Sequence, residues 1–70
     1  MMNIVFTLHT KFRLKKRKIT EDEVIQAIKS PDKLTKIDGK YYVQKNISRG
    51  NIEVIYVREN YIKVVTVYWV

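Results

Sequence analysis

The sequence contains no cysteine, one histidine (His9) and only two glycines, Gly39 and Gly50. Without cysteine, neither a disulfide bond nor a thiolate metal site can stabilise the chain. A single histidine excludes a metal site built from several histidines of one chain. The glycine-rich phosphate-binding loops G-x-x-x-x-G-K-[ST] and G-x-G-x-x-G are also absent. We therefore expect a protein without a metal site and without a cofactor.

The sequence also lacks a long apolar run, since none approaches the roughly 20 residues that span a bilayer. Residues 1–8 are too short for a signal peptide and have no run of small residues for cleavage. We therefore expect a cytoplasmic protein that does not enter a membrane. A chain of 70 residues is one domain, residues 1–70. Hydrophobic residues make up 46% of it, which is enough for a folded core.

Acidic residues are scarce: seven Asp and Glu stand against 14 Lys and Arg, for a formal net charge of +7. Such an excess predicts an anionic partner, with nucleic acid first and an acidic protein or a membrane surface after it. The excess can also serve only to keep a small protein in solution. The charge therefore indicates a class of partner and no particular molecule.

A basic helix is predicted from Leu8 to Ile19. Side chains at helical spacing form a stripe that we expect to attach this helix to the core, and its members are Leu8, Phe12, Lys15 and Ile19. Six basic residues and no acid lie between Lys11 and Lys18. Because such a helix repels itself, tertiary packing, the acids that follow or a polyanion must hold it.

A second helix is predicted from Thr20 to Ser30, and its start is marked by a capping box. Thr20 is followed three residues later by Glu23, so each side chain can bond to the backbone N–H of the other. The apolar side chains predict an inward face of Val24, Ala27 and Ile28, with Ile25 at its edge. Pro31 ends the helix, because the residue before proline is kept out of the α region.

The rest of the chain alternates between strand-like runs and turns. Asp38-Gly39 is a strong hairpin signal, and further turns are expected at 48–51 and 58–60. Strands are predicted at 3–7, 33–38, 40–47, 52–57 and 61–70. The order β-α-α-β-β-β(-β) with hairpin connections predicts an α+β domain in which two N-terminal helices pack on one face of an antiparallel sheet.

The last two strands are apolar on both faces. In the first of them, Ile52, Val54 and Tyr56 should face one side, and Ile55 and Val57 the other. The final strand should alternate likewise, with Ile62, Val64, Thr66 and Tyr68 opposite Val65, Val67 and Trp69. Two helices cover only one face, so either these strands are central or the second face meets a partner. We favour a homodimer or a bound protein segment.

A second stripe on the basic helix carries the candidate chemistry. His9, Arg13 and Arg17 recur at i, i+4 spacing, and Lys16 lies among them. Guanidinium groups bind phosphate oxygens in bidentate fashion, and histidine transfers a proton near neutral pH. Together they could support metal-free RNA cleavage, with a base on the 2′-hydroxyl, cations on the phosphorane and an acid for the leaving oxygen. Alternatively, His9 packs at the helix start and the arginines form a solvated flank.

Four further residues are candidates outside the helices. Lys45 interrupts the apolar face of its strand and could point into a basic site, while Arg49 lies in a turn beside Gly50. Tyr42 is on the polar face of its strand and could stack on a base. Tyr68 could supply a phenol. Each of the four can equally have a purely structural role.

The run H-x3-R-x3-R-x-I-T-x-x-E-V-x3-I-x-x-P, from His9 to Pro31, resembles a family of small bacterial and archaeal domains of unknown function. That family is grouped with the RelE/ParE toxin superfamily. The strand Val64-Val-Thr-Val-Tyr68 also resembles the C-terminal strand of the family, so the resemblance covers most of the chain. It implies the same helix and strand order and a role in toxin–antitoxin systems.

The resemblance also implies two kinds of target. RelE-like proteins cleave messenger RNA on the ribosome without a metal, using basic residues and often a C-terminal tyrosine, whereas ParE-like proteins inhibit DNA gyrase. By position, Tyr68 is the nearest match to that tyrosine, and Arg49 or Lys45 to the basic residues on the sheet. The final strand departs from the RelE pattern because it has no basic cluster.

The resulting hypothesis is a basic RelE/ParE-like protein that binds RNA or the ribosome, and acts as a toxin-type, metal-independent endoribonuclease with an acidic antitoxin partner. The catalytic residues would be His9, Arg13 and Tyr68, and the nucleic-acid-binding residues Arg13, Lys16, Arg17, Lys45, Arg49 and Tyr42. One alternative is a non-enzymatic nucleic-acid-binding module. Another is a protein-interaction domain whose second sheet face docks an acidic helix. The sequence leaves open whether the protein is an enzyme.

Overall fold

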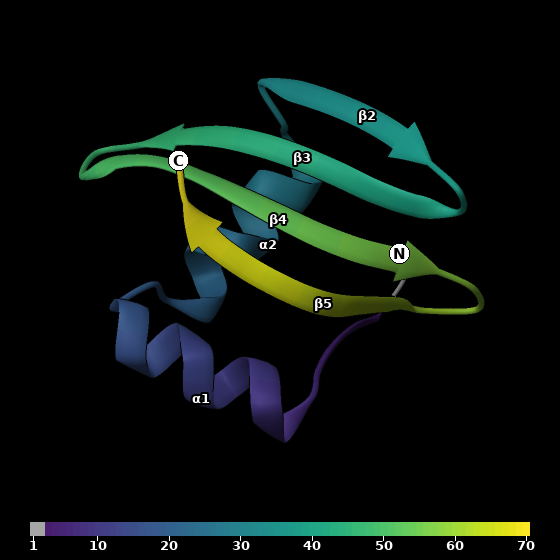
Figure 1. Cartoon of the computed structure of the whole chain (residues 1–70), viewed down its shortest axis with the longest axis horizontal. Helices are drawn as coiled ribbons and strands as arrows, with labels where there is room; N and C mark the ends of the chain where they lie inside the picture. Colours follow the sequence, from purple (N-terminus) through teal and green to yellow (C-terminus); the bar gives the residue numbers. More distant parts are fainter. Residues whose placement is uncertain (1–2) are drawn as a thin grey trace.

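The computed structural model describes residues 3–70 and consists of two helices packed against a five-stranded sheet (Figure 1). The elements in chain order are β1 (Ile4–Phe6), α1 (Leu8–Arg17), α2 (Glu21–Lys29), β2 (Lys33–Ile37), β3 (Lys40–Ile47), β4 (Gly50–Arg58) and β5 (Ile62–Trp69). The strand order across the sheet is β1-β5-β4-β3-β2. The predicted α+β class and the predicted order of helices and strands are confirmed.

The sheet is mixed rather than wholly antiparallel. Strands β2 to β5 pair antiparallel with their neighbours, but β1 pairs parallel with β5, with Ile4 opposite Ile62 and Phe6 opposite Val64. Short hairpins force consecutive strands to be antiparallel, whereas β1 and β5 are the first and last strands and no hairpin joins them. The first and last strands therefore meet inside one sheet.

Two tight turns set the register of the central hairpins. Asp38 and Gly39 both have positive φ, 50° and 78°, as a two-residue hairpin turn requires. Ser48 and Arg49 form the next turn, which is shorter than expected because Gly50 already belongs to β4. Gly50 has a φ of 141°, a conformation that residues with a side chain rarely adopt, while a Cβ atom there would be in ordinary contact with the Trp69 ring at 3.4 Å.

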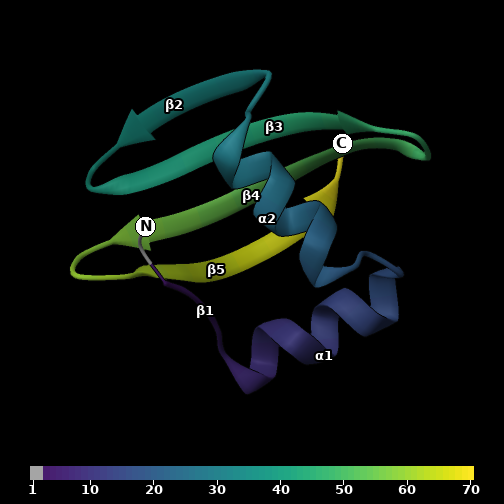
Figure 2. The same ribbon diagram turned by 180° about the vertical axis from the view of Figure 1, so that it is seen from behind.

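Helix α2 covers one face of the sheet, where it lies across β3 and β4 (Figure 2). Its capping box is present: the Thr20 N–H donates to Glu23 at 2.9 Å, and the Glu23 N–H donates to the Thr20 hydroxyl at 3.1 Å. Val24 and Ala27 are fully buried as predicted, and Ile25 and Ile28 are half-buried. The core consists of Leu14, Ile19, Val24, Ala27, Val43, Ile52, Val54, Tyr56, Val64 and Val67.

Helix α1 faces the core with a different side from the one predicted. Leu8 and Phe12 are 86% and 67% exposed, so the expected apolar stripe is wrong at both positions. Thr10 and Leu14 are buried in their place. Ile19 is buried as expected, but it follows the left-handed residue that ends the helix, Lys18. The prediction of Lys15 along the core is also wrong, because Lys15 is exposed.

The orientation of α1 follows from the backbone of β5. Because β1 pairs with β5 only as far as Val64, the β5 edge beyond that point has no strand partner. The buried Thr10 hydroxyl donates to the carbonyls of Val64 and Val65 at 3.1 and 3.2 Å, and Arg17 donates to the carbonyl of Val67 at 2.6 Å. Helix α1 thus supplies the donors that a further strand would have supplied, and protects this sheet edge.

A β-bulge alters the faces of β5. Ile55 of β4 pairs with Thr66, but the next β4 residue, Tyr56, pairs with Val64, so Val65 is an extra residue. Val64 and Val67 therefore both lie in the core, although strict alternation places them on opposite faces. The predicted alternation of β5 is wrong beyond Val64, while that of β4 agrees with the observed burial.

Candidate nucleic-acid interface

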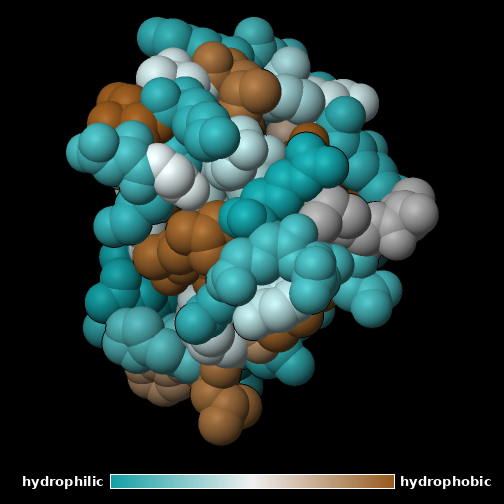
Figure 3. Space-filling view, turned by 90° about the vertical axis from the view of Figure 1, so that its right-hand side faces the viewer, coloured by the Kyte–Doolittle hydropathy of each residue, from teal (hydrophilic) through white to brown (hydrophobic). Residues whose placement is uncertain are grey.

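The outward side of α1 is basic and carries exposed apolar groups. We call its exposed residues, Leu8, His9, Lys11, Phe12, Lys15 and Lys16, the α1 outer face. A hollow of about 550 Å³ opens on it, lined by His9, Phe12, Arg13, Lys16 and Arg17. Apolar side chains protrude from the molecule at the lower end, where α1 begins (Figure 3). The structure therefore brings His9, Arg13, Lys16 and Arg17 together, as the sequence predicted.

The two arginines of this hollow also hold α1 in place. Arg17 donates to the Val67 carbonyl, and Arg13 donates to the Thr66 hydroxyl at 3.4 Å. Both side chains are only partly exposed, whereas His9 and Lys16 are exposed. Lys16 and Arg17 lie in the last helical turn, where the negative end of the helix dipole favours cations. His9 and Lys16 are thus the most exposed polar groups of this hollow, while the two arginines both line it and hold the helix.

Arg49 has a structural position at the junction of the helices. Its guanidinium donates to the carbonyl of Lys18 at 2.8 Å and to the Glu23 carboxylate at 2.5 Å, and lies 5.4 Å from the centre of the Trp69 ring. The hydrogen bond from Arg49, followed by that from the Thr20 N–H, lowers the pKa of Glu23. Arg49 thus ties the end of α1 to the start of α2.

Lys45 lies away from the α1 outer face. It is on the side of β3 that faces the helices and forms an ion pair with Asp32 at 3.7 Å. The same carboxylate accepts a hydrogen bond from the Asn46 N–H at 2.7 Å. Lys45 therefore balances the charge of Asp32, and the structure does not join it to the other predicted basic residues.

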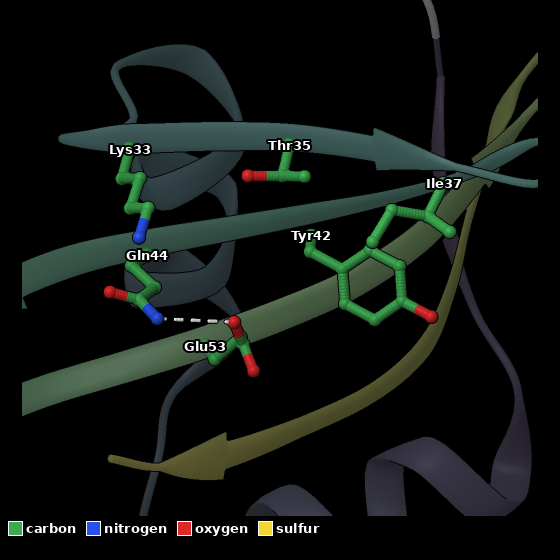
Figure 4. Close-up of a pocket in the computed structure, with 6 residues that line it drawn as sticks. All are labelled: Lys33, Thr35, Ile37, Tyr42, Gln44 and Glu53. Atoms are coloured by element: carbon green, nitrogen blue, oxygen red, sulfur yellow. Dashed lines mark hydrogen bonds between the residues drawn. The ribbon is translucent and has the colours of Figure 1, made fainter.

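Tyr42 and Tyr68 lie on the sheet face opposite α2, which we call the open face. Tyr68 donates a hydrogen bond to the Glu53 carboxylate, and this bond is the main cause that raises the pKa of Tyr68. Tyr42 borders a hollow of about 180 Å³ lined by Lys33, Thr35, Ile37, Tyr42, Gln44 and Glu53 (Figure 4). The open face therefore holds a second hollow, separate from that on α1.

The predicted catalytic trio does not share one hollow. His9 and Arg13 line the hollow on α1, whereas Tyr68 is bonded to Glu53 on the open face. A phenol is already neutral near pH 7, and the bond to Glu53 raises the pKa of Tyr68 further, so this group would not act as a base there. Among residues 3–70, no three His, Asp or Glu side chains are grouped to hold a metal ion.

Sequence reasoning missed two features of these surfaces. Phe12 was assigned to the core because it is apolar and spaced four residues from Leu8, yet its ring borders the basic hollow. Its neighbours at i−3 and i+4, His9 and Lys16, could have indicated this. The pair of Gln44 and Glu53 was also missed, because their contact depends on the register of β3 and β4.

Three comparisons place the chain among known proteins. The model of a family described as a domain of unknown function (DUF4258) matches residues 6–69. No match was found among curated proteins or among solved structures. No helix in residues 3–70 has the length and apolar character needed to cross a membrane. Since the match covers almost the whole domain, the predicted resemblance to a family of unknown function is confirmed, and the chain belongs to the DUF4258 family. The grouping of this family with the RelE/ParE superfamily stays a prediction.

Proposed function

We propose that this protein binds RNA through the α1 outer face. The observation that carries the proposal is the exposed ring of Phe12, set between His9 and Lys16 at the rim of a basic hollow. Aromatic rings among cations are the combination that binds nucleic-acid strands, because bases stack on the ring while phosphates meet the charges. No acidic residue lies in α1 to oppose a polyanion.

The alternative reading of the basic face as a merely solvated surface explains Phe12 poorly. Lys11, Lys15 and Lys16 would serve solubility equally well without an aromatic ring among them. The fold does not need this ring, because Thr10, Leu14 and Arg17 already attach α1 to β5 and the core. The ring is also not an isolated apolar group, because Leu8, one helical turn before it, is exposed too, and exposed apolar groups that gather on one face mark an interaction site.

Salt-dependent binding tests this proposal. Fluorescence anisotropy of a labelled RNA oligonucleotide should show affinity that falls steeply with salt, because phosphate contacts release counterions. Lys16→Ala should reduce the slope of log affinity against log salt by about 1. Lys29→Ala, which removes an exposed lysine from α2, is the matched control and should change the slope less. Absent or salt-independent binding, or equal effects of the two variants, would contradict the proposal.

A toxin-type, metal-independent endoribonuclease of the RelE/ParE kind is a second candidate. It is supported by His9, a proton carrier, lining the same hollow as the Arg13 guanidinium. Because Tyr68 lies apart from that hollow, this candidate enzyme does not use its phenol in catalysis. Growth and RNA integrity on expression of the wild type and of His9→Ala test it, with Lys29→Ala as control. Equal growth and intact RNA in all three would exclude the enzyme while leaving RNA binding in place.

A further inference from the structure

The open face has a regular arrangement that the proposed function does not use. Strand pairing places its side chains in two rows across the sheet. One row is Thr66, Ile55, Tyr42 and Thr35, and the next is Tyr68, Glu53, Gln44 and Lys33. Neither helix covers these rows, since α2 lies on the other face (Figures 1 and 2). Both rows end at β2, which is exposed along its whole length.

The hollow at the β2 end of these rows has an apolar end and a polar end. Tyr42, Ile37 and Thr35 form the apolar end, where the Tyr42 ring lies broadside next to Ile37 (Figure 4). Lys33, Gln44 and Glu53 form the polar end, and the Lys33 ammonium group points down toward Gln44 (Figure 4). A volume of about 180 Å³ suits one small group rather than a long chain.

Hydrogen bonds fix the orientation of the polar end. The Glu53 carboxylate accepts from the Tyr68 hydroxyl with one oxygen and from the Gln44 amide nitrogen, at 3.2 Å, with the other. Because a carboxylate only accepts, the Gln44 nitrogen must face it and the Gln44 oxygen must point elsewhere. The Gln44 oxygen lies on the side of this residue away from Tyr42 (Figure 4), so the donor that the polar end offers to a ligand is the Lys33 ammonium group.

The basic hollow on α1 connects with this face. Arg13 reaches past the β5 edge to donate to Thr66, the first residue of the row that contains Tyr42. Tyr42 lies two strands from Thr66, a distance of roughly 10 Å given the ordinary strand spacing. One extended nucleic-acid strand can therefore place a phosphate at Arg13 and a nearby base at Tyr42.

We propose that the hollow beside Tyr42 binds an unpaired nucleobase, so that the RNA bound by this protein is single-stranded. The base stacks on the Tyr42 ring with its edge toward the polar end, where the Lys33 ammonium group donates to it. A duplex cannot use this hollow, because its bases are stacked and paired within the helix. This inference rests on the proposed RNA binding by the α1 outer face and adds the class of RNA.

Free adenosine, which has no phosphate, tests the hollow independently of α1. In the ¹⁵N-labelled protein, saturable amide shift changes should appear at Thr35, Tyr42, Gln44 and Glu53. They should persist in Tyr42→Phe, which keeps the ring, and vanish in Tyr42→Ala. Circular dichroism melts confirm that each variant is folded. Shifts that are absent, or that appear only on α1, would overturn the inference.

Oligonucleotide binding supplies the second test. A single-stranded RNA should bind more tightly than a blunt duplex of the same sequence. Tyr42→Ala should lower the affinity for the single-stranded RNA by roughly tenfold and leave the affinity for the duplex unchanged. Tyr61→Ala, which removes an exposed tyrosine from outside the hollow, is the control and should change neither.

The outcomes separate the two proposals. If RNA binding depends on salt but has the same affinity in Tyr42→Ala, the base site is refuted and the α1 interface is retained. If adenosine changes the amide shifts at the hollow but the protein binds no RNA, the α1 interface is refuted and the base site is retained. Equal affinity for single strand and duplex overturns the inference of single-stranded RNA.

Discussion

Replacing Thr10 by valine tests how α1 is attached to the sheet. Valine has nearly the shape of threonine, so the packing of this side chain, which is 1% exposed, should be preserved. The hydroxyl is lost, and with it the hydrogen bonds to the carbonyls of Val64 and Val65 at 3.1 and 3.2 Å. The Val64 carbonyl is then buried without this donor, at the free edge of β5 that α1 protects.

The magnitude follows from the cost of an unsatisfied buried group. Loss of one partner of a buried hydrogen bond costs about 1–3 kcal/mol, so we expect a destabilisation of about 2 kcal/mol for Thr10→Val. In a domain of this size, that change lowers the melting temperature by roughly 8–16 °C. Urea denaturation followed by circular dichroism should show a lower midpoint with an unchanged slope.

Thr10→Ser is the matched control, because it keeps the hydroxyl and removes a methyl group. Serine, threonine and valine have similar helix propensities, so the comparison isolates the hydrogen bonds. Removing the methyl group costs about 1 kcal/mol, so the valine variant should be the less stable of the two. A valine variant as stable as the wild type, or more stable than the serine variant, would refute this account of the β5 edge.

Three further changes separate binding, ion pairing and titration. Phe12→Ala should lower the free energy of unfolding by less than about 1 kcal/mol, since the ring is 67% exposed, yet it should weaken RNA binding. A large loss of stability in urea denaturation would show instead that Phe12 packs in the core. Glu23→Gln keeps the capping box but removes the charge that meets Arg49, at a cost below about 1 kcal/mol at neutral pH. Because the folded-state pKa of Glu23 is lowered, that difference should be present above the ordinary pKa of 4.5 and disappear as the pH falls through the folded-state value, which denaturation at several pH values measures. The absorbance change during an alkaline titration should lose, in Tyr68→Phe, a phenol whose pKa lies above the ordinary value of 10.0. If the phenol that is lost has an ordinary pKa, the hydrogen bond to Glu53 is contradicted.

Local signals in the sequence were sufficient for most of the secondary structure. The capping box at Thr20 and Glu23, the stop at Pro31 and the turn at Asp38-Gly39 lie at their predicted positions. These signals act within a few residues, through hydrogen bonds and backbone sterics that any fold retains. Helix α2, with its single clear apolar face, was therefore predictable down to the residues it buries.

The candidate site was predictable as a set of residues on one helix, but its partners were not. The spacing of His9, Arg13 and Arg17 already places them on one side of a helix, and they line one hollow. Nothing in that spacing indicates that Arg17 binds the Val67 carbonyl. The position of Arg49 over Trp69 likewise depends on a turn meeting the last strand.

The sequence by itself determined the helices, the strands, the excess of positive charge and the basic side of α1. Only the tertiary structure decided which side of α1 faces inward, because that depends on the carbonyls that β5 leaves unpaired beyond Val64. Thr10 and Arg17 are separated from their β5 partners by 54 and 50 residues, so no local pattern could report those bonds. The need to satisfy these buried carbonyls outweighed the burial of Leu8 and Phe12, and left an aromatic ring among lysines on the surface.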